Sequence, residues 1–135
     1  MRLSHLAFAL LLALAIPASA EDRNPVIEGV IQSQIDAFLA DDFETAFTYA
    51  SPMIQRGFGS SERFGQMVRQ GYPMVWRPSD VRYLDVETRG PFDYQKVLIT
   101  DDKGVPHVLE YQMIEDDGGY QINGVRILRA EALGA

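Results

Sequence analysis

Residues 101–125 read DDKGVPHVLEYQMIEDDGGYQINGV, and this stretch decides the fold. Its middle part, residues 105–114, alternates two sets of side chains, which is typical of a β-strand with one buried face. Turn residues bound this strand on both sides, Asp101-Asp102-Lys103-Gly104 before it and Asp116-Asp117-Gly118-Gly119 after it. Turns this short join antiparallel neighbours, because parallel strands need a long crossover. The stretch therefore predicts the centre of an antiparallel meander.

Three more strands are expected around this centre, because β-branched and aromatic residues cluster between turn signals. Gly90-Pro91 marks the turn between the first two strands of the sheet. The three strands are predicted at 81–88, 94–100 and 120–129. Together with residues 105–114 they predict a curved four-stranded antiparallel sheet.

The last strand changes phase in its middle. Tyr120 and Ile122 point to one face, whereas Val125 and Ile127 are out of phase with them. Asn123-Gly124 lies at the change, and one extra residue there would return the later side chains to the inner face. The sequence thus predicts a β-bulge at this point.

The alternation within residues 105–114 also predicts which side chains face the core. The more apolar face carries Val105, His107, Leu109, Tyr111 and Met113. The opposite face carries Pro106, Val108, Glu110, Gln112 and Ile114. We expect the first set to face the helices, with His107 near the start of the strand.

The residues before the sheet predict about three helices. Ile27, Ile31, Ile35 and Phe38 recur at helical spacing and predict a helix over 24–40. Asp41 with Glu44 resembles a capping box that opens a second helix. That helix is expected to end at Ser51-Pro52, because the residue before a proline avoids helical dihedral angles.

The third helix is predicted from Ser60 or Ser61 to about Gly71, and residues 53–58 are expected to add one further turn before it. Residues 72–78 carry prolines near both ends and include the single tryptophan, Trp76. Because of these prolines, this segment is predicted to be a packed connector without regular helix.

Residues 1–20 have the pattern of a cleavable secretory signal. Arg2 precedes an apolar run over residues 6–16, Pro17 breaks the run, and Ala18-Ser19-Ala20 provides small residues for cleavage. A run of this length is well short of the roughly 20 residues that span a bilayer. We expect cleavage after Ala20, a single domain over 21–135, a periplasmic or secreted location and no stable membrane insertion.

Composition excludes several classes of chemistry. The 135-residue chain has no cysteine, which excludes a disulfide scaffold, a thiolate metal site and a cysteine nucleophile. Without Arg2, the mature chain has 11 Lys and Arg against 19 Asp and Glu, a net charge of −8. An acidic chain repels phosphate backbones, so no nucleic-acid partner is expected. With His107 as its only histidine, the mature chain is not expected to hold a metal or another cofactor.

Three stretches resemble the cone-shaped nuclear-transport-factor-2-like superfamily. They are Gln32-Ser33-Gln34-Ile35-Asp36-Ala37-Phe38, Asp41 to Pro52, and Gly118-Gly119-Tyr120-Gln121-Ile122-Asn123-Gly124-Val125. The last resembles the Gly-Trp-x-Ile ending of that superfamily, with Tyr120 in the tryptophan position. The resemblance covers about Val26 to Leu128, and the helical part looks like an exported bacterial branch known only as a domain of unknown function. It implies an α+β fold whose helices pack on one curved sheet.

The superfamily includes isomerases, dehydratases and polyketide cyclases as well as binding and association domains, so fold alone does not fix the function. Its isomerases use an inward carboxylate as a base opposite neutral acid donors. By this resemblance Asp85 and Tyr111 are candidate catalytic residues. His107 is a third candidate, because a histidine on the inward face of its strand could act as a general base. The side chains expected to line a pocket are Tyr72, Trp76, Tyr83, Tyr94, His107, Tyr111 and Met113.

Three functions remain open from the sequence. The first is an exported, non-catalytic domain that binds a small apolar ligand or an envelope protein. The second is a small lyase or isomerase that uses a pocket His or Asp with a Tyr donor. The third is a structural domain that forms a homodimer through its exposed sheet face, where Val108 and Ile114 would suit an interface.

Overall fold

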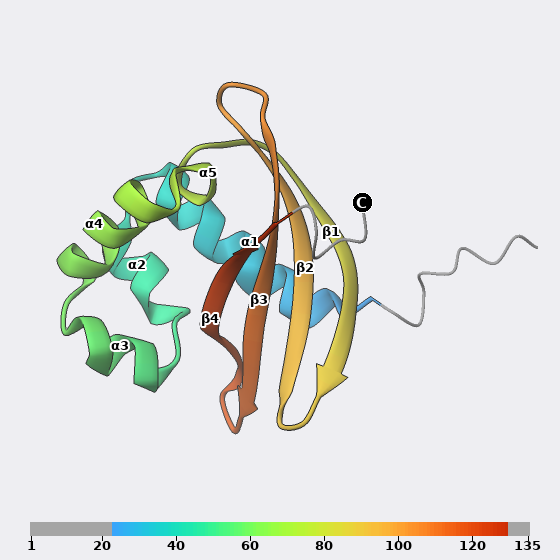
Figure 1. Ribbon diagram of the computed structural model, residues 1–135. Helices are drawn as coiled ribbons and strands as arrows, with labels where there is room; N and C mark the ends of the chain where they lie inside the picture. The colour runs from blue at the N-terminus through green and yellow to red at the C-terminus, as the bar shows by residue number, and fades with distance from the viewer. Residues whose placement is uncertain (1–22, 130–135) are drawn as a thin grey trace, which may run out of the picture.

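Helices precede strands along the chain in the computed structural model, which describes residues 23–129 (Figure 1). The helices are α1 (Pro25–Leu39), α2 (Phe43–Thr48), α3 (Pro52–Phe58), α4 (Ser61–Gly71) and α5 (Pro73–Trp76). The strands are β1 (Pro78–Arg89), β2 (Phe92–Asp101), β3 (Pro106–Asp116) and β4 (Gly119–Leu128). The predicted signal segment, residues 1–20, lies outside the described residues.

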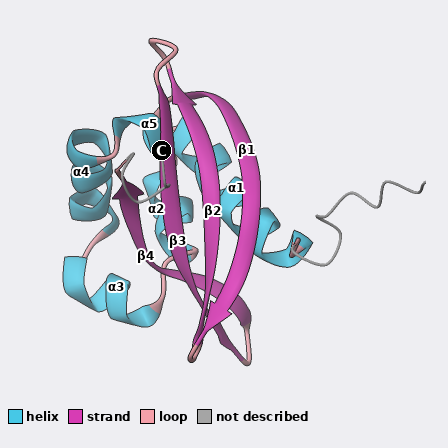
Figure 2. Ribbon diagram, turned by 45° about the vertical axis from the view of Figure 1, so that its right-hand side comes forward, coloured by secondary structure: helices cyan, strands magenta, loops and turns pink. Residues whose placement is uncertain are grey.

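The four strands form one antiparallel sheet in the order β1-β2-β3-β4, as predicted. The helices lie against one face of this curved sheet, with α1 running across it and α3 and α4 beside the β4 edge (Figures 1 and 2). The α+β class and the helix-on-sheet arrangement are therefore confirmed.

The number of helices differs from the prediction of about three. Residues 52–58 form a complete short helix, and Pro73–Trp76 forms one helical turn where no regular helix was expected. In both cases proline occupies the first helical position, where its missing N–H is not needed and its fixed φ suits the helix. The prolines thus start these helices rather than exclude them.

The predicted bulge in β4 is present. Gln112 pairs with Gly124 and Met113 pairs with Ile122, so that Asn123 is the extra residue. A second bulge, not predicted, lies in β1 between Tyr83 and Val86. The Gln95 amide from β2 fills this second bulge, since its Nε2 donates to the carbonyl oxygens of Leu84 and Lys96, each at 2.9 Å.

The core lies between α1 and the inner face of the sheet. The inner faces of α1 and the central strands contribute the hydrophobic side chains without solvent exposure, Ile27, Ile31, Ile35, Val97, Ile99, Leu109, Tyr111 and Met113. The helical stripe and the inner face of β3 are thus confirmed from Leu109 onward. Val105 is exposed in the turn before β3, because the strand begins only at Pro106.

Helices α2 and α4 approach each other closely at Gly65. A Cβ atom at Gly65 would lie 2.6 Å from Cδ1 of the Phe43 ring, closer than carbon atoms pack. Gly29 in α1 has no such neighbour, and a Cβ there would meet open space. The two glycines therefore offer a matched pair of substitutions within helices.

We expect Gly65→Ala to lower the free energy of unfolding by about 1–3 kcal/mol, because the Phe43 ring must move to admit the methyl group. Gly29→Ala should instead raise it by about 0.5–1 kcal/mol, since alanine favours the helix without a clash. Urea unfolding of the two variants measures both effects. Equal stabilisation by both substitutions would show that the α2–α4 contact adapts freely.

Candidate ligand-binding site

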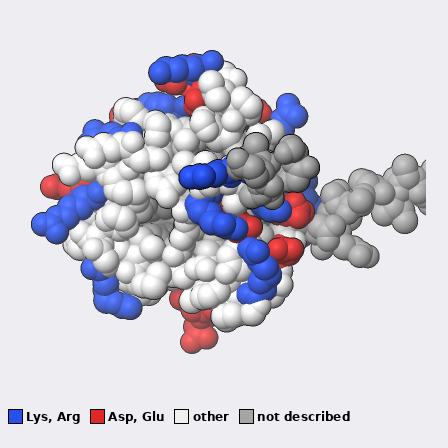
Figure 3. Space-filling model, in the orientation of Figure 1, with Lys and Arg blue, Asp and Glu red and all other residues white. Residues whose placement is uncertain are grey.

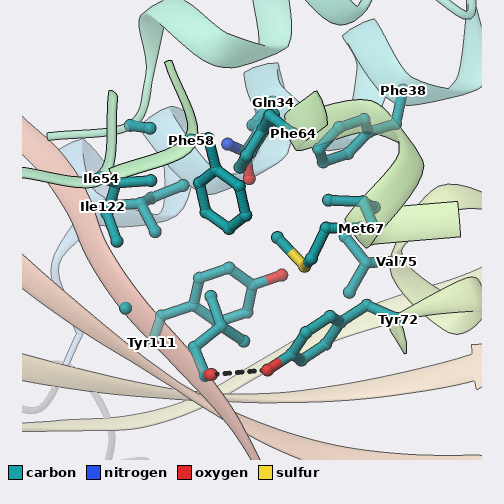
Figure 4. A pocket seen from close by; sticks show the side chains of 14 residues that line it. Gln34, Phe38, Ile54, Phe58, Phe64, Met67, Tyr72, Val75, Tyr111 and Ile122 are labelled. Carbon is teal, nitrogen blue, oxygen red and sulfur yellow. Dashed lines mark hydrogen bonds between the residues drawn. The ribbon is translucent and has the colours of Figure 1, made fainter. Parts of the chain in front are cut away.

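An apolar pocket lies between α3, α4 and α5 on one side and β3 and β4 on the other (Figure 4). Its volume is about 240 Å³. A cavity of about 150 Å³ is enough to hold benzene, so this pocket is large enough for a somewhat larger organic molecule. Most of its wall is hydrophobic, from Phe38, Ile54, Phe58, Phe64, Met67, Val68, Val75 and Ile122.

Phe64 of α4 organises the aromatic part of the wall. Its ring centroid lies 5.1 Å from that of Phe47, 5.6 Å from that of Phe58 and 5.9 Å from that of Phe38. Rings at these separations favour tilted and edge-to-face packing, which fixes their orientation. The helices therefore present a rigid aromatic surface to the pocket.

Tyr111 of β3 supplies a hydroxyl group to the opposite wall. The residue has no solvent exposure, and its hydroxyl has no hydrogen-bond partner among the described residues. Figure 4 shows this hydroxyl directed away from the sheet, toward Met67 and the centre of the pocket. Burial, with a smaller contribution from Tyr83 and Tyr72, raises the pKa of Tyr111 above its usual value. The group is thus a neutral hydrogen-bond donor at physiological pH.

Gln34 of α1 and Tyr72 add further polar atoms to the pocket. The Gln34 Nε2 donates to the carbonyl oxygen of Ala46 at 3.1 Å, which leaves its Oε1 on the pocket side in Figure 4. The Tyr72 hydroxyl donates to the carbonyl oxygen of Val125 at 3.0 Å and so ties the end of α4 to β4. Tyr72 closes the wall, while Gln34 offers an acceptor that makes no hydrogen bond with the other described residues.

Within residues 23–129, fourteen residues line this pocket, and none of them is an aspartate, glutamate, histidine, lysine or arginine. The same described part of the chain has no cluster of three His, Asp or Glu side chains that could hold a metal ion. The pocket can therefore bind by shape, apolar contact and neutral hydrogen bonds. It offers no side chain that exchanges a proton near neutral pH.

Of the predicted pocket residues, Tyr72 and Tyr111 line the pocket, and the structure places the other five elsewhere. Trp76 turns away because its Nε1 donates to Asp41 at 2.9 Å. Tyr83 lies under α1 and donates to Oε1 of Gln32 at 2.9 Å.

Met113 is fully buried in the core, and Tyr94 lies on the outer face of the sheet, where the Arg89 guanidinium sits 3.8 Å from its ring centroid. Asp85 is exposed and lies in the β1 bulge. The bulge changes the alternation of side chains in β1, so Asp85 does not share the inner face with Tyr83. The sequence analysis considered Asp85 as a base beside a pocket tyrosine, and its exposed position corrects that expectation.

His107 lies at the rim of the sheet rather than in the pocket. Its Nε2 donates to Oδ2 of Asp101 at 2.9 Å, while Oδ1 of Asp101 accepts from the backbone N–H groups of Lys103 and Val105. These contacts order the β2–β3 turn. The His107 side chain and, more weakly, the two N–H groups hold the pKa of the Asp101 carboxyl below its usual value.

A carboxyl group with a lowered pKa in the folded state stabilises the fold above its unfolded pKa, and this stability is lost as the pH falls through the folded value. We therefore expect the wild-type melting temperature to fall below about pH 4, and to fall less steeply in Asp101→Asn. Melting temperatures between pH 7 and the acid range test this. Asp102→Asn, the exposed neighbour, is the control, and a profile for Asp101→Asn that matches this control would contradict the assignment.

A buried charge on the outer face was missed by the sequence reasoning. Glu110 has a side-chain exposure of only 3%. Its Oε1 forms ion pairs with the Nη2 atoms of Arg126, at 2.9 Å, and of Arg89, at 3.0 Å. Alternation placed Glu110 on the outer face, but not beneath two arginines from other strands.

Over the visible face of the molecule, basic and acidic side chains are interspersed (Figure 3).

The pocket-lining residues of the helices were also missed. Ile54, Phe58, Phe64 and Met67 line the pocket, yet the sequence showed Phe64 and Met67 only as one apolar helix face. Their spacing signals burial but does not distinguish a filled core from a pocket wall.

None of the helices in the described part of the chain is long and apolar enough to cross a bilayer.

Helices on one face of a curved antiparallel meander, with an apolar pocket between the layers, form an α+β domain with an NTF2-like fold. The chain belongs to the family described as domain of unknown function DUF4864, which it matches over residues 20–135. The fold is similar to the crystal structure of a Campylobacter jejuni protein described as an NTF2-like transpeptidase, with a TM-score of 0.55 and 12% sequence identity. The match covers 76% of this chain and 99% of that one, and at this identity it shows the fold alone. No curated protein sequence matches the chain.

Proposed function

We propose that this domain binds a small, mainly apolar molecule in the pocket between its helices and its sheet. The observation that carries the proposal is a pocket of about 240 Å³ with a mostly hydrophobic wall. This wall includes the Tyr111 hydroxyl, which has no hydrogen-bond partner within residues 23–129. Apolar pockets with a few polar groups are the usual form of small-molecule sites. Binding would remove apolar surface of the ligand and of the pocket from contact with water, which favours binding.

Binding is better supported than catalysis of the lyase or isomerase type. Such catalysis needs a base positioned beside the acid donor, and geometry comes before pKa in that requirement. Tyr111 is a donor in the pocket, but the two candidate bases, His107 and Asp85, lie outside it. The pocket thus contains the candidate acid donor but neither of the candidate bases.

Naphthalene is a suitable probe, because two fused rings are the next size above benzene. We expect wild-type protein to bind it with a dissociation constant on the order of 10–100 μM in isothermal titration. Val68→Phe places a ring in the pocket from a buried position and should weaken binding by at least about tenfold. Val26→Phe adds the same ring at a position that is 60% exposed, and should leave binding unchanged.

Circular dichroism and thermal melting establish that each variant is folded. If Val68→Phe does not fold, Met67→Trp fills the pocket from a half-buried and more adaptable position. Absence of naphthalene binding by the wild type, or equal binding by the filled variants, would overturn the proposal.

Export to the periplasm is the second part of the proposal. It is supported by the signal pattern of residues 1–20 and by a family match that begins at residue 20, where that pattern ends. Native mass spectrometry of protein purified from its own periplasm should give the mass of residues 21–135, together with any co-purified ligand. A protein that retains residues 1–20 in the soluble cytoplasmic fraction would contradict export.

A further inference from the structure

We propose that the ligand is an uncharged molecule with an apolar body and one alcohol or phenol hydroxyl, which hydrogen-bonds to Tyr111. This inference rests on the proposed function and names the chemical class that the same pocket selects. It follows from three properties of the pocket wall: an unused donor, an unused acceptor and the absence of charge among the residues that line it.

The unused donor is the Tyr111 hydroxyl. A buried hydroxyl almost always has a partner, because burying it without one is unfavourable. The Tyr111 hydroxyl has none among the described residues, although the neighbouring Tyr72 hydroxyl is bonded to the backbone of Val125. Burial also keeps the phenol protonated, so that it is a donor throughout the physiological pH range. Because Tyr111 has no solvent exposure, a ligand oxygen reaches its hydroxyl when a neighbouring side chain such as Met67 moves aside.

The acceptor is Oε1 of Gln34, for which residues 23–129 supply no hydrogen bond. Its amide cannot simply rotate to present a donor, because Nε2 is held by the carbonyl oxygen of Ala46. Gln34 is 3% exposed, so this orientation is enclosed by the core. A ligand hydroxyl both accepts and donates, and therefore suits a wall with a Tyr donor and a Gln acceptor. A ligand oxygen that only accepts could satisfy Tyr111 alone.

The lack of charge restricts the ligand further. None of the pocket-lining residues carries a cation that could pair with a carboxylate or phosphate, or an anion that could pair with an amine. Bringing an unpaired charge into such a wall is strongly unfavourable. Lipid-like acids and amines are therefore disfavoured relative to neutral alcohols and phenols of the same shape.

Four molecules with the same two-ring body test this inference: naphthalene, 2-naphthol, 2-methoxynaphthalene and 2-naphthoate. Isothermal titration at neutral pH should show that wild-type protein binds 2-naphthol about tenfold more tightly than naphthalene. It should bind 2-naphthoate more weakly than naphthalene. 2-Methoxynaphthalene, which accepts but cannot donate, should bind more weakly than 2-naphthol.

Tyr111→Phe is the matched variant, because it removes the hydroxyl and retains the ring. It should bind 2-naphthol and naphthalene with more nearly equal affinities, since only the contact with Gln34 Oε1 would remain for the ligand hydroxyl. Binding of naphthalene without a preference for 2-naphthol would overturn this inference and leave the proposed function intact. A preference of unchanged size in Tyr111→Phe, or 2-methoxynaphthalene bound as tightly as 2-naphthol, would also overturn it. Failure of all four molecules to bind would overturn the proposed function itself.

Discussion

Replacing Phe38 by alanine is expected to lower the free energy of unfolding by about 3–5 kcal/mol. Phe38 is 1% exposed at the end of α1, and its ring packs against those of Phe43 and Phe64 with centroids 6.0 and 5.9 Å away. Alanine would remove these contacts and leave a cavity, since three helices hold the surrounding backbone in place. The same ring lines the pocket, so the cavity would open into it.

Leu39→Ala is the control for this substitution. Leu39 is the next residue along α1 and also loses a large apolar side chain, but it is 45% exposed. Its replacement should change the free energy of unfolding by no more than about 0.5 kcal/mol. Urea denaturation measures both values. Similar losses for the two variants would show that the Phe38–Phe43–Phe64 contacts do not hold the helical layer together.

The expected effect at Phe38 depends on a pattern that the sequence displays directly. The spacing of Ile27, Ile31, Ile35 and Phe38 is set by one local period, and a helix must bury such a stripe whatever it packs against. The same holds for the inner face of β3 and for the bulge at Asn123, which follows from the phase change along one strand. These features are local, and the sequence predicted them.

The pocket could not be predicted in the same way, because it depends on how separate elements are spaced. Aromatic residues were expected to line it, yet Trp76 and Tyr83 find hydrogen-bond partners on α1 or just after it and turn toward them. Much of the wall comes instead from α3 and α4. The periodicity of these helices shows which face is apolar, but not where the helices lie relative to the sheet.

Glu110 shows a similar limit within the sheet. Its direct neighbour across the β3–β4 ladder is Arg126, which a hairpin register can predict. Arg89, however, reaches it from β1 across the ring of Tyr94 on β2. Such a contact requires the register of three strands and the bulge in β1 to be known together.

Asn123→Ala is expected to lower the free energy of unfolding by about 2–3 kcal/mol, because it breaks one buried and one partly buried hydrogen bond at the β4 bulge. The Ser51 hydroxyl donates to Asn123 Oδ1 at 2.7 Å, and Asn123 Nδ2 donates to Gln112 Oε1 at 2.7 Å. Alanine would leave the Ser51 hydroxyl and the Gln112 carbonyl oxygen without these partners. Ser51 also caps α3, since its Oγ accepts from the Ile54 backbone N–H.

The loss should come from a contact between the two layers rather than from β4 alone. The chain between α2 and α3 already joins this strand through two backbone hydrogen bonds, Ser51 N–H to Ile122 and Ile122 N–H to Tyr49. A double-mutant cycle with Ser51→Ala and Asn123→Ala should therefore show a coupling energy of about 0.5–1.5 kcal/mol. Additive losses would mean that each side chain acts separately. Coupling would show that the bulge fixes the start of α3, and with it the wall that Ile54 and Phe58 give to the pocket.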